Sequence, residues 1–368
     1  MKVLMLSTDS KIFEKNSAVH ARMVEYGRLC EELHIIIFHT RIKNQESRIK
    51  ISENVFIYST NSLSRWLALF DAYKIAKRIF QNTKYKIQNT LVTCQDPFET
   101  GFVGWRISCA LGARLELQVH TDFMSPYFAT ENIKNKIRMM IAKFLLPKAD
   151  CVRVVSERIK KSIINFTNAP IAVLPIFTDI KKFQDADGSS IRARFSQFEK
   201  IVLVVSRLEP EKNVAQAIEV FAKIVTKYSK VGLLIVGDGS ERKNLKSQIS
   251  NLKLGDNVVF IGTQKEVAPY YVAADVYLHT SLYEGYGLAL LEAYVAGLSI
   301  VTTNVGIVGD VVSGEGIFVC QVDDEDCLVN ALSSSLSNQK RVMRKPEQAS
   351  EEEYLLAYKK QWELCAHK

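Results

Sequence analysis

Residues 201–237, IVLVVSRLEPEKNVAQAIEVFAKIVTKYSKVGLLIVG, decide the fold class of this chain. The stretch opens with a short apolar run rich in Val and Ile, which is typical of a buried strand. Apolar residues then recur at helical spacing from Asn213 to Tyr228, and a second short apolar run follows. A strand, a helix and another strand in this order predict one unit of a parallel sheet with helices on its faces.

The same alternation recurs in both halves of the chain, which predicts an α/β fold of two doubly wound, Rossmann-like domains. Residues 184–200 are polar with a Gly-Ser-Ser centre, so we expect an interdomain linker there. The domains are then 1–183 and 201–345, and 346–368 is a helix that returns towards the N-terminal domain. The other expected strands are 2–8, 34–40, 89–95, 113–120, 151–156, 171–177, 257–262 and 298–304, and the longer helices include 64–80, 132–146, 241–254 and 287–297.

Composition excludes several classes of protein. A chain of 368 residues, 47% of them hydrophobic, is typical of a folded protein with two domains. No apolar run approaches the roughly 20 residues of a membrane span, and the first one is too short for a signal peptide, so we expect a cytoplasmic protein. Seven cysteines are scattered without a Cys-x-x-Cys pair, which favours reduced, mostly buried thiols over disulfides or a zinc site.

Charge is spread unevenly along the chain. Residues 1–200 carry 31 Lys and Arg against 19 Asp and Glu, whereas 201–368 carry 17 against 21. A basic half indicates an anionic partner, either a lipid phosphate, a membrane surface or a nucleic acid, although a solvated basic face remains an alternative. No nucleic-acid recognition motif accompanies the charge. The segments 64–80 and 131–148 mix bulky apolar with basic residues, which favours a peripheral place on an anionic membrane, but an apolar stripe also serves to pack a helix on the sheet.

Cationic and glycine-bearing loops follow the strands of the second half. Arg207 and Lys212 come after the strand at 201–206, where ligands of open α/β sheets bind, so they can clamp an anionic diphosphate. Gly237 and Gly239 form a strand-to-helix turn that allows close approach of a ligand. Each feature alone is also compatible with an ordinary solvated loop.

The stretch 281–293, SLYEGYGLALLEA, places Glu284 and Glu292 on either side of a helix start near Gly287. The first amides of that helix can bind phosphate oxygens. Eight helical positions would place the two glutamates roughly 80° apart, so they need not act as one acid–base pair. We expect each carboxylate to bind hydroxyl groups of its own along an extended ligand, with a diphosphate between them. A capping role for Glu284 and a solvated position for Glu292 remain the alternatives.

Taken together, the segments ADCVRVVSERIKKSI, SRLEPEKN, LLIVGDGSERKNL and SLYEGYGLALLEAYVAGLSIVTTNVG resemble the retaining glycosyltransferases of family four. The resemblance covers nearly all of residues 150–320. It implies the GT-B fold, in which two Rossmann-like domains face each other across a cleft that holds a nucleotide diphosphate sugar. It also implies transfer of that sugar to an acceptor with retention of configuration. Members of this family usually need no divalent cation, so neither a metal nor another cofactor is expected.

The resemblance assigns roles to individual residues. Arg207 and Lys212 would neutralise the leaving diphosphate, Glu284 would face the transferred sugar, and Glu292 would bind the ribose. His120, at the end of a strand in the first half, matches a histidine that the family often has beside the sugar. The remaining donor-binding residues so implied are Gly237, Gly262, Gln264, Gly285, Tyr286, Gly287, Leu288, Ala289, Asn16 and Ser17.

The first half departs from the family pattern in two loops. Asn16 and Ser17 stand where the family often has a Gly-Gly pair, so the part of this loop in donor or acceptor binding stays open. The loop at 175–179 also lacks a common Asn-Gly pair.

Three other classes of function compete with a glycosyltransferase. These are a GT-B-fold sugar-nucleotide epimerase, a non-catalytic sugar-nucleotide-binding protein, and an NAD-dependent oxidoreductase. The last lacks the expected Gly-x-Gly-x-x-Gly after the first strand. The base, uracil or guanine, the sugar and the acceptor are not fixed by the sequence. A polyprenyl-diphosphate-linked sugar or another polysaccharide or glycolipid precursor fits the basic first half.

Overall fold

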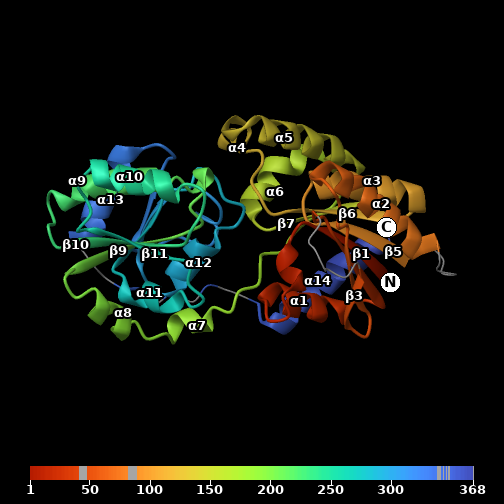
Figure 1. The fold of residues 1–368 in the computed structure, drawn as a ribbon, viewed down its shortest axis with the longest axis horizontal. Coiled ribbons are helices and arrows are strands. Elements are labelled where there is room, and N and C mark those ends of the chain that lie inside the picture. The colour runs from red at the N-terminus through yellow and green to blue at the C-terminus, as the bar shows by residue number, and fades with distance from the viewer. Residues whose placement is uncertain are drawn as a thin grey trace. The chain divides into compact units, whose positions relative to one another are not determined.

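The computed structural model of this protein describes residues 1–40, 48–81, 89–337, 341, 342, 344, 346 and 349–367. The chain forms two compact units, whose elements are labelled in Figure 1. Unit 1 comprises 1–124, 132–175 and 349–368, and unit 2 comprises 125–131 and 176–348.

This division differs in detail from the domains expected from the sequence. The chain passes into unit 2 at 175/176 rather than after 183, and the expected linker 184–200 contains a helix within unit 2. The short segment 125–131, in the middle of the first half, also belongs to unit 2. Residue 345, the expected end of the second domain, lies outside the described residues. The C-terminal helix packs within unit 1.

Unit 1 is built on an eight-stranded sheet in the order β3-β4-β2-β1-β5-β6-β7-β8. All neighbouring strands pair in parallel except β3 and β4, whose antiparallel pairing was not predicted from the sequence. The strands are fully buried near the centre because continuous apolar runs such as KVLML fit a sheet covered on both faces. Its strands are β1 (Lys2–Ser7), β2 (Glu32–Ile37), β3 (Arg48–Ser52), β4 (Val55–Ser59), β5 (Thr90–Cys94), β6 (Arg114–Val119), β7 (Cys151–Val154) and β8 (Ile171–Val173). Its helices are α1 (Ala18–Gly27), α2 (Arg65–Gln81), α3 (Glu99–Leu111), α5 (Ile133–Leu145), α6 (Glu157–Ile163) and α14 (Glu351–Ala366).

Unit 2 is built on a six-stranded, fully parallel sheet in the order β11-β10-β9-β12-β13-β14. The chain builds outward from β9 in one direction and then, beginning with β12, in the other. Loops that follow β9 and β12 therefore lie at the point where ligands of such sheets bind. The strands are β9 (Lys200–Val205), β10 (Val231–Val236), β11 (Val258–Gly262), β12 (Val276–His279), β13 (Ser299–Thr303) and β14 (Ile317–Cys320). The helices are α4 (Pro126–Glu131), α7 (Lys181–Gln184), α8 (Ser189–Arg194), α9 (Val214–Val225), α10 (Arg242–Asn251), α11 (Ala268–Ala273), α12 (Leu288–Val295) and α13 (Glu325–Ser337).

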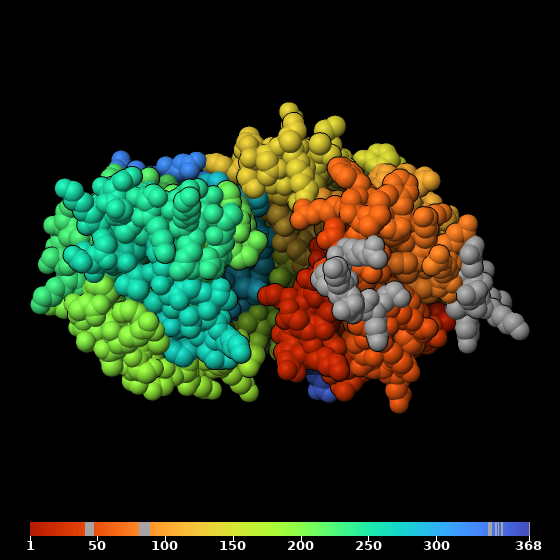
Figure 2. All heavy atoms as spheres, viewed as in Figure 1, coloured from red at the N-terminus to blue at the C-terminus, as the bar shows by residue number. Residues whose placement is uncertain are grey.

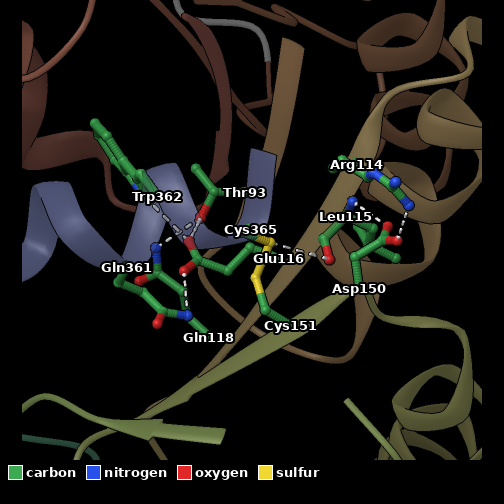
Figure 3. The surroundings of a disulfide bond; sticks show 10 residues. All are labelled: Thr93, Arg114, Leu115, Glu116, Gln118, Asp150, Cys151, Gln361, Trp362 and Cys365. Atoms are coloured by element: carbon green, nitrogen blue, oxygen red, sulfur yellow. Dashed lines mark hydrogen bonds and ion pairs between the residues drawn. A yellow bond between two sulfur atoms is a disulfide. The ribbon is translucent and has the colours of Figure 1, made fainter. Parts of the chain in front are cut away.

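The helix α14 is held against unit 1 by buried polar contacts and a disulfide (Figure 3). Glu116 of β6 is fully buried and accepts hydrogen bonds from the indole of Trp362 at 3.2 Å and from Gln361 at 3.3 Å. Cys151 of β7 is bonded to Cys365 of α14. A buried carboxylate that receives donors from one helix fixes both the place and the rotation of that helix.

The expectation of reduced thiols is wrong for four of the seven cysteines. Besides the bond from β7 to α14, Cys320 and Cys327 form a second disulfide. Cys30, Cys94 and Cys109 are free. The first pair is separated by 214 residues, and only the sheet order and the return of α14 bring the two sulfurs together. Spacing in the sequence does not reveal such a pair.

None of the helices in the described part of the chain is long and apolar enough to cross a membrane.

Candidate functional site

Two loops at the carboxyl edge of the unit 2 sheet lie side by side. One follows β9, the other follows β12, and these strands are neighbours. The amide of Leu282 donates to the carbonyl of Glu211 at 2.9 Å, and the hydroxyl of Thr280 donates to the carbonyl of Asn213 at 2.8 Å. These bonds hold the two loops in one register, so the charged side chains that they carry can meet.

Lys212 and Glu284 form an ion pair between the two loops. Nζ of Lys212 donates to Oε1 of Glu284 at 2.6 Å, and the two side chains are only 13% and 12% exposed. The hydroxyl of Ser281 donates to the same oxygen at 3.0 Å, and Nε2 of His279 lies 3.5 Å from it. Burial acts to raise the pKa of Glu284, but His279 and the charge of Lys212 outweigh it and lower that pKa to about 2. The carboxylate is therefore ionised across the neutral range.

Arg207 stands apart from this pair. Its side chain is 71% exposed, and its guanidinium donates to Glu211 at 2.8 Å. The structure thus brings together two of the expected charged residues, Lys212 and Glu284. Arg207, the third, comes from the same loop as Lys212 but is exposed to solvent.

The helix α12 begins at Leu288, directly after Gly287, which has a left-handed φ of 92°. No side chain caps this N-terminus. The first amides of a helix have no acceptor within the helix, so those of Leu288 and Ala289 are available for an anion. The loop before the helix, with Gly285 and Tyr286, is buried against the segment that follows β13.

A glycine fixes how closely that segment approaches the loop. A Cβ at Gly306 would lie 2.3 Å from the carbonyl oxygen of Tyr286, and φ there is 56°. The neighbouring amide of Ile307 donates to the same oxygen at 3.0 Å. Only glycine fits such a close, left-handed position, so Gly306 sets the place of the loop that carries Glu284.

Glu292 lies in the second turn of α12 and has its own partner. Its Oε2 accepts a hydrogen bond from the hydroxyl of Tyr271 at 2.8 Å. Burial raises the pKa of Glu292, and the bond from Tyr271 counteracts this only in part. Neither a fully solvated position nor a shared hydrogen bond with Glu284 is found, so the two glutamates occupy distinct electrostatic environments.

The glycine turn after β10 packs on the loop of Arg207. Gly237 has a φ of 132°, and a Cβ there would lie 1.9 Å from the carbonyl oxygen of Ser206. Its amide donates to the carbonyl of Gly262 at 2.9 Å, and Gln264 follows two residues later with its side chain bonded to the carbonyl of Ile261 at 3.3 Å. The structure therefore brings the expected base-binding residues to one edge of the sheet, beyond β10 and β11.

His120 lies in unit 1, immediately after β6. Its Nε2 lies 3.1 Å from Oε1 of Gln118, which also accepts from Arg153 at 2.9 Å. Because that oxygen can only accept, the proton of His120 is on Nε2 and Nδ1 is an acceptor. Burial, followed by the charges of Arg153 and Arg22, lowers the pKa of His120 to about 3, so the imidazole is neutral at neutral pH.

Asn16 and Ser17 lie at the start of α1. The hydroxyl of Ser17 caps this helix by accepting from the amide of His20 at 3.1 Å and donates to the carbonyl of Lys11 at 2.6 Å. Asn16 is exposed. The Ser17 side chain thus caps the N-terminus of α1. A serine directly before a helical run is the usual sequence signal of such a cap.

Sequence reasoning missed four residues that shape the site. Three are buried rings behind Glu284 and Glu292, and the fourth is the glycine that determines the loop approach. The ring residues stand at ordinary core positions of a helix and a strand, so their polar contacts gave no local signal. They are Tyr271, Tyr277, His279 and Gly306. Within the described residues no cluster of three or more His, Cys, Asp or Glu side chains could hold a metal ion.

Comparison with known proteins identifies relatives for this arrangement. Residues 190–353 match the family described as Glycosyl transferases group 1. Over 223 residues the chain is 30% identical to N-acetyl-alpha-D-glucosaminyl L-malate synthase of Bacillus anthracis, covering 58% of this chain and 57% of that protein. Over 230 residues it is 28% identical to alpha-monoglucosyldiacylglycerol synthase of Streptococcus pneumoniae, covering 58% and 52%. The matches thus span about half the length of these curated relatives.

Solved structures share the fold over nearly the whole chain. Sucrose-phosphate synthase of Thermosynechococcus elongatus superposes with a TM-score of 0.75 at 20% identity and covers 100% of this chain and 94% of its own. HepE of Anabaena, solved in complex with UDP and glucose, gives a TM-score of 0.67 at 18% identity with the same coverage. The fold of the chain is GT-B, as expected from the sequence.

Proposed function

Because residues 190–353 match the family of glycosyl transferases group 1, we propose that this chain is a retaining glycosyltransferase. It moves a sugar from a UDP- or GDP-sugar to a glycan or lipid-linked acceptor in the synthesis of a cell-surface polysaccharide or glycolipid. The observation that carries the proposal is the buried pair of Lys212 and Glu284 at 2.6 Å, beside the uncapped N-terminus of α12. A cation, a carboxylate and free helix amides at one sheet edge suit a diphosphate joined to a sugar.

Each part of the donor has a group to bind it. Lys212 and Arg207 neutralise the diphosphate, and the amides of Leu288 and Ala289 bind its terminal phosphate. Glu284 accepts hydrogen bonds from hydroxyls of the transferred sugar, and Glu292 accepts them from the ribose. The family resemblance also assigns His120 to the sugar, and within unit 1 its imidazole is neutral with Nδ1 as an acceptor. Gly237, Gly262 and Gln264 border the base, and Gly285, Tyr286 and Gly287 form the donor-binding loop that leads into α12. Asn16 and Ser17 of unit 1 are kept as donor-binding candidates from the family resemblance.

The reaction breaks the bond between the anomeric carbon and the diphosphate oxygen. Positive charge develops on the sugar ring while negative charge develops on the departing phosphate. Lys212, Arg207 and the helix amides stabilise that phosphate charge at fixed positions, which is the contribution expected to lower the barrier most. We assign this task to side chains and amides alone, without a metal ion. Turnover that is unchanged by EDTA supports that assignment, and loss of turnover that Mg²⁺ or Mn²⁺ restores refutes it.

The acceptor class is inferred from relatives and from the surface of unit 1. The names of relatives include alpha-monoglucosyldiacylglycerol synthase and the phosphatidylinositol N-acetylglucosaminyltransferase GPI3 subunit of Saccharomyces cerevisiae, 28% identical over 200 residues. One face of α5 carries the exposed apolar residues Ile133, Ile137, Met140 and Phe144, of which the first is 76% exposed. The segment lies at the surface in the yellow region of Figure 2.

Basic residues surround that apolar face. Lys134 and Lys136 are exposed on α5, and Lys148 stacks its ammonium 4.3 Å from the ring centroid of Phe144. An exposed apolar stripe with cations beside it suits the boundary of an anionic membrane, where each basic residue contributes about 1 kcal/mol. The chain therefore works as a peripheral protein at the cytoplasmic face of a membrane.

Liposome binding tests the membrane part of the proposal. Lys134→Glu with Lys136→Glu should weaken binding to phosphatidylglycerol vesicles at least about tenfold at low salt. The matched control is Lys243→Glu with Lys246→Glu, which makes the same charge change on exposed positions of α10. Equal binding by both double variants, or no binding by the parent chain, refutes this surface.

A nucleotide screen tests the enzymatic part. A panel of UDP- and GDP-sugars is added to the full chain, and the melting temperature is followed. A specific donor at 100 times its Kd stabilises the chain by about 2.7 kcal/mol. Incubation of that donor with glycolipid acceptors and analysis of the product by NMR must then show the anomeric configuration of the donor. If no nucleotide raises the melting temperature, or if the product is inverted, the proposal fails.

A further inference from the structure

A chain of three buried rings lies behind the loop between the two glutamates. It consists of Tyr271 from α11 and Tyr277 and His279 from β12, of which the tyrosines are fully buried and His279 nearly so. Tyr277 and His279 are two residues apart on one strand and therefore lie on the same face of the sheet. One end of the chain reaches Glu292 and the other reaches Glu284.

The Glu292 end rests on Tyr271. Its hydroxyl donates to Glu292 at 2.8 Å and lies 3.4 Å from the carbonyl oxygen of Ala289. The ring centroids of Tyr271 and Tyr277 are 5.7 Å apart. A fully buried tyrosine that donates to a carboxylate restricts that carboxylate to one rotamer.

The Glu284 end rests on His279. Its ring stacks on Tyr277 with centroids 5.9 Å apart, and Nδ1 lies 3.2 Å from the Tyr277 hydroxyl. That hydroxyl also lies 3.3 Å from the carbonyl oxygen of Val205. Nε2 is buried, has no hydrogen-bond partner in the described part of the chain, and lies 3.5 Å from Oε1 of Glu284.

Proton placement follows from these neighbours. If the Tyr277 hydroxyl donates to Val205, then Nδ1 of His279 must carry a proton, and a bare Nε2 would face an ionised carboxylate. If the hydroxyl instead donates to Nδ1, the single proton of a neutral imidazole is on Nε2. An Nε2–H that can reach Glu284 therefore belongs to the second arrangement.

We propose that Tyr271 and His279 are positioning residues for the two glutamates, and that His279 takes over Glu284 when Lys212 turns to the donor diphosphate. The proposal rests on the proposed function and extends it. A diphosphate competes with Glu284 for the ammonium of Lys212. Loss of that partner would leave a buried carboxylate bonded only to Ser281, which is costly. The Nε2–H of His279, 3.5 Å away, closes onto the oxygen that Lys212 releases.

Two variants with different kinetic effects test whether Tyr271 positions Glu292 and His279 positions Glu284. Tyr271→Phe removes one hydroxyl and should raise the donor KM about tenfold with little change in kcat, since Glu292 meets the ribose in both ground and transition states. His279→Gln should lower kcat about tenfold or more and leave UDP affinity unchanged, because Glu284 faces the transferred sugar. Tyr270→Phe is the control, since this tyrosine is buried on the same helix.

A merely structural role would not separate KM from kcat in this way. If both variants change KM and kcat together, or if Tyr270→Phe has the same effect as Tyr271→Phe, the proposal is overturned. Melting temperatures of all three variants verify that each folds.

An NMR measurement tests the ring chain without any substrate. The six histidines of the chain are labelled with ¹⁵N, and His279 is assigned from the spectrum of His279→Gln. The expected signature is a protonated Nε2 whose shift moves when Lys212→Met is introduced, since Glu284 then turns to His279. An unprotonated Nε2, or a shift indifferent to Lys212→Met, overturns the proposal. This readout holds whether or not the chain transfers a sugar, so its failure is distinct from a failure of the proposed function.

Discussion

Replacing Lys212 by Met removes one charge and keeps most of the side-chain volume. In the structure the ammonium lies 2.6 Å from Glu284, and both side chains are nearly buried. The pKa of Glu284 is lowered from 4.5 to about 2, which corresponds to about 3 kcal/mol of stability at neutral pH. Burial opposes this lowering, and His279 keeps part of it after the substitution. We therefore expect Lys212→Met to destabilise unit 2 by about 1–3 kcal/mol at pH 7.

The sign of the pH dependence follows from the direction of that pKa. A carboxyl whose pKa is lower in the folded state stabilises the fold above its unfolded pKa, and this contribution is lost as pH falls towards the folded pKa. The difference between the parent chain and Lys212→Met should therefore be full at pH 7 and shrink between about pH 4.5 and pH 2. Calorimetric melting over this range, with unit 2 followed as its own transition, measures it.

Arg207→Met is the matched control for this measurement. Its side chain is 71% exposed, so its removal should leave the melting temperature nearly unchanged. Both variants should nevertheless lower turnover about 10²–10³-fold, because both charges act on the leaving diphosphate. Near-normal kcat in either variant, or a loss of stability in Lys212→Met that does not depend on pH, would refute the reasoning.

Three further outcomes are expected. Glu292→Gln should raise the donor KM with a smaller change in kcat, and an unchanged KM in steady-state assays contradicts a ribose contact. Gly306→Ala should destabilise unit 2 by more than about 1 kcal/mol and weaken nucleotide binding, because the new Cβ would meet the carbonyl of Tyr286. Thermal melting measures the loss of stability, and titration with UDP or GDP measures the loss of affinity. His120→Gln should lower the rate without changing the shape of the pH–rate profile between pH 5 and 8, since a histidine whose pKa is about 3 does not titrate there; a limb of the profile that disappears in the variant would show that His120 titrates.

The fold could be predicted because its signals are local. Each central strand is a short apolar run, and each amphipathic helix shows its period within a few turns, so the sequence predicts α9 and α10. The antiparallel pair β3–β4 is a local hairpin whose strands are only two residues apart, and it was missed although the segment lies within one window of the sequence. The place of 125–131 in unit 2 instead depends on contacts with distant segments, which no window of the sequence contains. The same holds for the disulfide between Cys151 and Cys365.

The sequence selects candidate site residues, whose roles stay predictions, but it does not give their contacts. Loops at the carboxyl edge of a parallel sheet carry the ligand groups, so Lys212, Glu284 and Glu292 could be selected by position. That Lys212 pairs with Glu284, whereas Arg207 points to solvent, depends on side-chain geometry. The three buried rings, Tyr271, Tyr277 and His279, resemble ordinary core residues in sequence. The hydrogen bonds of a buried ring do not change the spacing of apolar residues, so no sequence pattern reveals them.

The two glutamates differ most in how their charge is stabilised. Glu284 lies against His279 and the cation of Lys212, which hold its pKa at about 2 despite burial, so it remains an anion that can accept bonds from sugar hydroxyls. Glu292 accepts a hydrogen bond from a neutral hydroxyl, and burial raises its pKa although Tyr271 and the charge of Lys182 oppose this. A carboxylate of that kind gains most from new hydrogen-bond donors, because each one offsets part of its desolvation. A ribose supplies two such donors. The binding of a nucleotide should therefore lower the pKa of Glu292 and remove the cation from Glu284. Both carboxylates change partners because of the same ligand, and no proton passes between them.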